Sequence, residues 1–195
     1  MKKFLIAFCT LILFSSVTLM ATDDDSNKVP LDPKVRYGKL DNGMTYYIRS
    51  NDLPENRADF YIVFDVGAIL ENDDQDGLAH LTEHMAFNGT KNFPKKGVLD
   101  FLERNGVAFG HNVNAFTSLD VTAYNLNDVP LTKESVVDSA LLVIHDWSNY
   151  VSFEDEEIDA ERKVVHEEWR TRRSADFRMM KELMPTIYNG SKYAK

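Results

Sequence analysis

The fold is decided by residues 58–88, which read ADFYIVFDVGAILENDDQDGLAHLTEHMAFN. The first nine of them, residues 58–66, are mostly aromatic and β-branched, and they predict a buried strand. An acidic, turn-rich loop follows, and the composition of residues 76–88 then predicts a helix. A buried strand followed closely by a helix indicates a domain that combines a sheet with helices.

The sequence on either side of this stretch predicts more strands and one short helix. Residues 37–40 and 44–48 flank Asp41-Asn42-Gly43, and this arrangement predicts a hairpin because Asn-Gly tolerates positive φ. A short helix is expected over residues 98–105, closed by Gly106. Two further strands are expected over residues 113–119 and 121–126.

Three helices are predicted in the last third of the chain. Apolar residues recur at helical spacing over residues 132–147, and residues 175–188 form the last predicted helix. Between these two, Ser152 and Asp155 have the spacing of a capping box, which predicts a helix over residues 153–173. With the strands mostly first, we expect an α+β fold in which a mostly antiparallel sheet is covered by helices.

Composition and charge narrow the class of protein. The 195 residues contain 22 Lys and Arg against 31 Asp and Glu, which gives a net charge of −9. An acidic chain without a basic stripe is poorly suited to phosphate backbones, so we expect no nucleic-acid partner.

The N-terminus has the layout of a secretory signal peptide. Two lysines precede a nearly unbroken apolar run, small residues follow, and an acidic segment begins after Ala21. The alternative is a membrane anchor, but the apolar run falls short of the roughly 20 residues needed to span a bilayer. We therefore expect a signal peptide over residues 1–21, an exported protein without a stable membrane span, and a flexible lead-in over residues 22–34. The only cysteine, Cys9, lies within the predicted signal peptide.

The chemistry is concentrated in the predicted helix over residues 76–88. On a helix, His80 and His84 lie one turn apart on one face, so both imidazoles can reach one metal ion. Glu83 lies where it can reach a water on that ion without being a ligand itself. This H-x-x-E-H pattern is typical of inverted zinc motifs. The alternative is a solvated helix face with two incidental histidines.

A third ligand is expected from a later helix. Glu161 and Glu168 lie seven residues apart on one face of the predicted helix over residues 153–173, and either carboxylate could complete the site. The acidic residues 154–157 are expected to be solvated at the start of that helix, and His166 and Glu167 are expected at the surface.

Several segments, taken in order, resemble the pitrilysin/insulinase family of zinc metallopeptidases. They are YGKLDNGMTYYI, FDVGAILEN, GLAHLTEHMAFNGTKNFP, NAFTSLDVTAY and ERKVVHEEWR. The resemblance implies Zn²⁺ bound by His80, His84 and Glu168, with Glu83 as general base. It implies that Glu161 supports the site without binding the metal, and the match to this last segment favours Glu168 as the ligand.

The same resemblance implies a substrate site and a partner. Asn114 and Ala115 resemble an edge-strand segment that pairs with bound peptide, although Asn114 could instead be an ordinary turn or ladder residue. Members of the family use two related halves, so residues 35–195 would be the N-terminal catalytic domain in one half-shell, apparently truncated at its C-terminus. The expected function is a zinc endopeptidase of the bacterial periplasm or cell envelope that cleaves peptides or unfolded polypeptides. The alternative is a non-catalytic peptide-binding partner subunit or an inactive fragment.

Overall fold

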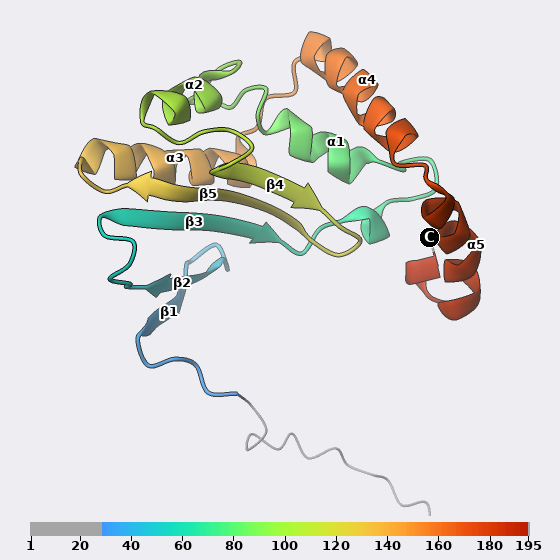
Figure 1. The fold of residues 1–195 in the computed structure, drawn as a ribbon, viewed down its shortest axis with the longest axis horizontal. Coiled ribbons are helices and arrows are strands. Elements are labelled where there is room, and N and C mark those ends of the chain that lie inside the picture. The colour runs from blue at the N-terminus through green and yellow to red at the C-terminus, as the bar shows by residue number, and fades with distance from the viewer. Residues whose placement is uncertain (1–28, 195) are drawn as a thin grey trace, which may run out of the picture. The chain divides into compact units, whose positions relative to one another are not determined.

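The computed structural model describes residues 29–194 (Figure 1). The expected signal peptide, and the expected lead-in as far as residue 28, lie outside the described residues. The chain divides into two compact units, with the boundary between Asn51 and Asp52. In the part that is described, no helix combines the length and the apolar character that crossing a membrane requires.

The first unit contains the predicted hairpin. Strand β1 (Val35–Lys39) pairs antiparallel with β2 (Thr45–Arg49). Gly43 takes a φ of 90° in the connecting turn, and the N–H of Leu40 donates to the carbonyl of Met44 at 2.8 Å. A left-handed glycine at the end of the turn is what the Asn-Gly pair predicts.

The second unit is built on a three-stranded antiparallel sheet. Its strands are β3 (Arg57–Phe64), β4 (Val113–Thr117) and β5 (Thr122–Pro130), arranged in the order β3-β5-β4. The central strand, β5, continues four residues beyond the predicted end at residue 126. It does so because β3 pairs with it as far as Pro130, and Asp128 takes a φ of 60° beside an irregularity in the β3 register.

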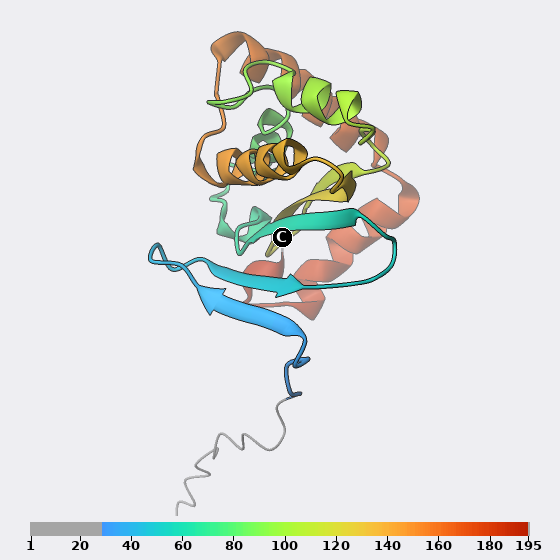
Figure 2. The same ribbon diagram turned by 90° about the vertical axis from the view of Figure 1, so that its left-hand side faces the viewer.

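One face of this sheet carries the core. Alternate residues of the strands pack with buried residues of α2 (Gly97–Arg104) and α3 (Glu134–Asn149), and with Ala86 at the end of α1 (Leu78–Met85). Helix α3 lies along β3 and β5 (Figures 1 and 2), whereas α1 lies beside β4. A short 3-10 turn, η2 (Ala68–Leu70), precedes α1. The predicted α+β fold, with an antiparallel sheet and covering helices, is therefore confirmed.

The last elements are α4 (Asp155–Thr171), α5 (Ala175–Ile187) and η3 (Lys192–Ala194). The predicted capping box is wrong. Helix α4 begins after Glu154 without a side-chain cap, and the N–H of Ser152 donates to the carbonyl of Gly89. This backbone contact holds Ser152 three residues before the first residue of the helix. Helix α5 does have a side-chain cap, because Ser174 accepts the N–H of Phe177.

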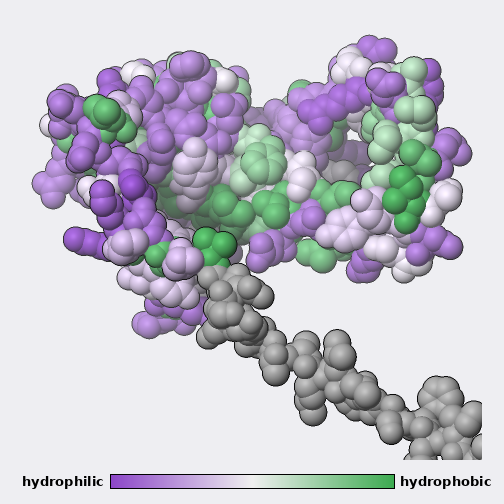
Figure 3. All heavy atoms as spheres, turned by 60° about the horizontal axis from the view of Figure 1, so that its bottom comes forward, coloured by the Kyte–Doolittle hydropathy of each residue, from purple (hydrophilic) through white to green (hydrophobic). Residues whose placement is uncertain are grey.

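Apolar side chains remain exposed on parts of the second unit. Figure 3 shows green side chains over the sheet and over the helical region at the right, where Figure 1 places α5. The exposed apolar residues of the outer sheet face include Tyr61, Val63 and Phe116. Helix α5 has no buried residue.

Candidate functional site

Helix α1 is held at both ends. At its start, the Glu71 carboxylate accepts the N–H of Gly77 at 3.1 Å and that of Ala79 at 2.7 Å, so it satisfies two donors that a helix leaves open. At its end, the indole N–H of Trp147 donates to the carbonyl of Ala86 at 3.0 Å. The carboxylate and the buried tryptophan fix where the side chains of α1 point.

The structure brings His80, His84 and Glu168 together. The two Nε2 atoms lie 3.3 Å apart, and carboxylate oxygens of Glu168 lie 3.5 Å from His80 Nε2 and 3.7 Å from His84 Nε2. A tetrahedral zinc with bonds of about 2.0–2.2 Å keeps its ligand atoms roughly 3.3–3.6 Å apart. Two imidazoles and one carboxylate with this spacing fit a zinc ion and leave a position for water.

Glu161 approaches Nδ1 of His84, whereas Glu168 approaches Nε2 of the same ring. The Oε2 of Glu161 is 2.9 Å from His84 Nδ1, and both side chains are partly buried. A carboxylate in this position accepts a hydrogen bond from Nδ1–H and keeps the proton on Nδ1, so the Nε2 lone pair is left for a metal. Glu161 and Glu168 are therefore distinguished by the nitrogen that each one approaches.

His80 is biased toward its neutral form. Burial lowers the pKa of its imidazole, and the neighbouring His84 adds to that lowering, while Glu83 and Glu168 act in the opposite direction. Neutral imidazole is the form that binds metals.

Glu83 is buried on the same helix, with only 8% of its surface exposed. The hydroxyl of Thr117 on β4 donates to Glu83 Oε2 at 2.6 Å. Tyr124 lies nearby: burial raises the pKa of its phenol, and the Glu83 carboxylate adds to that effect. A buried carboxylate is costly unless it is hydrogen-bonded, so Thr117 is an essential part of this environment.

Thr117 and Glu71 lie within the sequence motifs, but no role was predicted for either residue. Thr117 shares a strand face with Ala115, two residues earlier, and this period of two is the signal that could have placed it toward α1. Glu71 is the second-to-last residue of FDVGAILEN. An acidic residue shortly before the start of a predicted helix is the signal that could have indicated its contact with that helix.

Asn114 and Ala115 lie on β4, which is an edge strand of the sheet as described. The two side chains point to opposite faces. Ala115 packs against the core, whereas Asn114 is exposed and its Nδ2 donates to the carbonyl of Gly110 at 3.4 Å.

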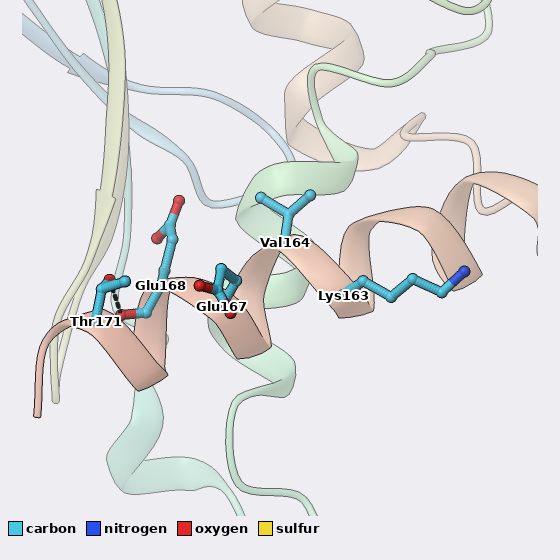
Figure 4. Close-up of a pocket in the computed structure, with 5 residues that line it drawn as sticks. All are labelled: Lys163, Val164, Glu167, Glu168 and Thr171. Carbon is cyan, nitrogen blue, oxygen red and sulfur yellow. Dashed lines mark hydrogen bonds between the residues drawn. The ribbon is translucent and has the colours of Figure 1, made fainter.

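Glu167, the neighbour of Glu168 on α4, is not one of the three converging residues. Figure 4 shows the side chains of Glu167 and Glu168 leaving α4 in different directions, beside Lys163, Val164 and Thr171. Glu167 is paired with Arg170, and both Glu167 and His166 are exposed, as predicted. Thr171 donates to the main-chain carbonyl of Glu168 at 2.9 Å.

Comparison with known proteins adds independent evidence. Residues 46–194 match the family described as Insulinase (Peptidase family M16). The "Probable zinc protease PqqL" of Haemophilus influenzae is 37% identical over 194 residues, which make up 99% of this chain and 21% of that protein. The protein of the same name in Escherichia coli is 35% identical over 92% of this chain and 19% of its own length.

A solved structure agrees with these matches. The first half of the periplasmic protease PqqL from Escherichia coli superposes with a TM-score of 0.78 and 36% identity, over 85% of this chain and 35% of that one. The chain thus spans about a fifth of the length of these curated relatives. On the family match and the identity to these relatives, this chain belongs to the insulinase family of peptidases, M16.

Proposed function

We propose that this chain carries the zinc site of a metalloendopeptidase that hydrolyses peptides or unfolded polypeptides. His80, His84 and Glu168 would hold the ion, and residues 35–195 would form the metallopeptidase domain. The convergence of two Nε2 atoms and the Glu168 carboxylate at distances of 3.3–3.7 Å is the observation that carries this proposal.

The ion and its neighbours would divide the chemistry between them. Zinc, when bound, supplies Lewis acidity that lowers the pKa of a bound water to about 7 and polarises a carbonyl. Glu83 takes the proton of the attacking water and then delivers it to the leaving amine. Glu161 keeps His84 in the tautomer whose Nε2 is free to bind. A metal site that only stored or sensed zinc would have no use for a buried carboxylate beside it.

The edge of β4 supplies a place for the substrate. An extended peptide can add to an exposed sheet edge through main-chain hydrogen bonds, and this mode suits unfolded segments better than folded ones. Asn114 and Ala115 would take part in this pairing. Their strand also carries Thr117, which contacts Glu83, so a peptide bound there would lie close to the proposed base.

The complete enzyme would need more polypeptide than this chain. Because its curated relatives are about five times as long, we infer that a second homologous half completes the catalytic unit. A relative described as periplasmic, together with the signal-like N-terminus, supports export to the periplasm.

Replacing Glu83 by Gln in the full-length protein tests this assignment. Gln keeps the size of the side chain but cannot accept the proton, so peptide cleavage should fall by about two to four orders of magnitude. Zinc content should stay at the wild-type level, because Glu83 is not a ligand. Cleavage of an unfolded polypeptide and metal analysis of the same sample provide both readouts.

Glu103→Gln is the matched control, since Glu103 is an exposed glutamate on α2. It should leave both readouts unchanged. Undiminished cleavage by the Glu83→Gln protein would remove the assigned base, and loss of zinc from it would mean that Glu83 belongs to the ligand set.

A further inference from the structure

We propose that Thr117 is a positioning residue for the general base, and that it couples docking of a peptide on β4 to the orientation of Glu83. This inference rests on the proposed peptidase function. Its starting point is the hydrogen bond of 2.6 Å between the Thr117 hydroxyl and Glu83 Oε2.

The direction of this hydrogen bond is fixed by its surroundings. A threonine hydroxyl has one proton to donate. Thr122, the partner of Thr117 across the sheet, donates to the carbonyl of Val66 at 2.8 Å, and its hydroxyl is 3.4 Å from that of Thr117. The proton of Thr117 therefore goes to Glu83, where charge-assisted hydrogen bonds are roughly twice as strong as neutral ones.

This contact assigns different tasks to the two oxygens of Glu83. With Oε2 engaged by Thr117, Oε1 is the oxygen left to accept a proton from water. A rotation of the carboxylate that exchanged its two oxygens would first have to break the hydrogen bond to Thr117. The side chain is also buried. Thr117 thereby holds the base in one of its two orientations.

The main chain of Thr117 faces the free edge of the sheet. The N–H of Ser118 donates to the carbonyl of Val121, so Ser118 and Val121 lie at a hydrogen-bonding position of the ladder. In an antiparallel ladder such pairs alternate with non-bonded ones. Thr117 and Thr122 are therefore a pair without main-chain hydrogen bonds to each other. The same holds for Ala115 and Tyr124, because Ala115 lies two residues before Thr117 on β4.

The N–H and carbonyl groups of Ala115 and Thr117 consequently point away from β5. An extended peptide added to this edge would bond to those groups. Thr117 would then bind substrate through its main chain while its side chain holds Glu83. This links the position of the peptide to the position of the base, since strand β4 carries both contacts.

Two substitutions in the zinc-loaded, full-length protein separate these roles. Thr117→Val keeps the shape and the main chain but removes the hydroxyl, whereas Thr117→Ser keeps the hydroxyl. We expect Thr117→Val to lower kcat about 10- to 100-fold, the usual worth of a hydrogen bond to a charged group, with KM within about threefold of wild type. Thr117→Ser should restore kcat to within about threefold of wild type.

A second readout does not depend on turnover. A peptide hydroxamate binds zinc and donates a hydrogen bond to the base carboxylate. Its affinity should fall about tenfold in Thr117→Val and remain near wild type in Thr117→Ser. Zinc content should be unchanged in both variants. Thr45→Val, in the exposed strand β2, is the matched control and should match wild type in every measurement.

Each outcome bears on one proposal. Wild-type kcat in Thr117→Val, equal losses in the Val and Ser variants, or loss of zinc would overturn the role of Thr117. Failure of the proposed function has a different signature: the wild-type protein would cleave no peptide, or Glu83→Gln would cleave as well as wild type. In that case the hydroxamate affinities of the two Thr117 variants still decide whether the hydroxyl orients Glu83.

Discussion

Three glutamates of the candidate site carry the same carboxylate group but differ in the groups that they contact. Glu168 faces the two Nε2 atoms, Glu161 faces Nδ1 of His84, and Glu83 faces the hydroxyl of Thr117. Their proposed roles as ligand, support and base follow from these contacts. Glu161 and Glu168 lie two turns apart on α4, and the resemblance of the ERKVVHEEWR segment favoured Glu168 as the ligand.

Zinc affinity should distinguish the two glutamates of α4. Removing an outer carboxylate that orients a histidine ligand costs about 10- to 100-fold in metal affinity, so Glu161→Gln should weaken zinc binding by that factor. Glu168→Gln removes a ligand and should weaken it further, by at least about another tenfold. A competition titration against a coloured chelator measures both constants on the full-length protein.

Glu167→Gln is the control for this comparison, because Glu167 lies beside Glu168 but is paired with Arg170. Its zinc affinity should equal that of wild type. The assignment of Glu168 as ligand fails if Glu161→Gln proves the more damaging of the two substitutions.

The local part of the site could be predicted from sequence, and the part made by contacts between elements could not. A spacing of four on a helix is enough to place His80 and His84 on one face. The hydrogen bond from Thr117 to Glu83 depends on which strand packs against α1 and in which register. No pattern within a single element contains that information.

At the scale of elements, the loop after α1 is tied to α3 by one buried carboxylate. Asp146 is fully buried and accepts hydrogen bonds from the hydroxyl of Thr90 and from the main chain and side chain of Asn92. Burial acts to raise the pKa of the Asp146 carboxyl, but these hydrogen bonds outweigh burial and lower it. His145 Nδ1 lies 3.3 Å from the same carboxylate.

Asp146→Asn should destabilise the protein by about 2–4 kcal/mol, because an amide presents donors to groups that themselves donate. The pKa of Asp146 is depressed in the folded state, so the stability it contributes is present above the unfolded pKa near 3.9 and is lost as pH falls through the folded value. Denaturant unfolding of wild type and variant should therefore differ by a constant amount from pH 7 to pH 5, and by less below pH 4.

The control for this comparison is Asp138→Asn, an exposed position on the same helix, which should unfold like wild type at every pH. A difference between wild type and Asp146→Asn that grows as pH falls would contradict the assigned linkage.

The ends of helices and strands also depend partly on contacts between elements, which sequence patterns do not contain. The hairpin and the helices were predicted within a few residues because turn residues and apolar spacing are local signals. The end of β5 was missed because Asn127 and Asp128 resemble turn residues, whereas β3 pairs with β5 on both sides of them and so continues the strand. The predicted cap at Ser152 failed because a backbone contact to Gly89 holds that residue before the helix.

At the scale of the whole molecule, α5 has more apolar surface than a helix in water usually presents. Its exposed apolar residues are Phe177, Met179, Met180, Leu183 and Ile187. Exposed patches of this kind mark interaction surfaces. Because the chain corresponds to 21% of the length of its Haemophilus influenzae relative, we expect other polypeptide of the full-length protein to lie on α5.

A charge placed on this helix should therefore act differently in two contexts. In the full-length protein, Leu183→Asp would be buried without a partner and should cost about 2–3 kcal/mol, seen as a lower midpoint of the first unfolding transition. In the isolated chain, the same substitution should leave stability nearly unchanged and reduce self-association in sedimentation experiments, because the side chain faces water. Lys181→Asp, at an exposed charged position of α5, should change the full-length midpoint little. If Leu183→Asp were equally harmless in the full-length protein, α5 would be a free surface there, and its apolar residues would need an external partner.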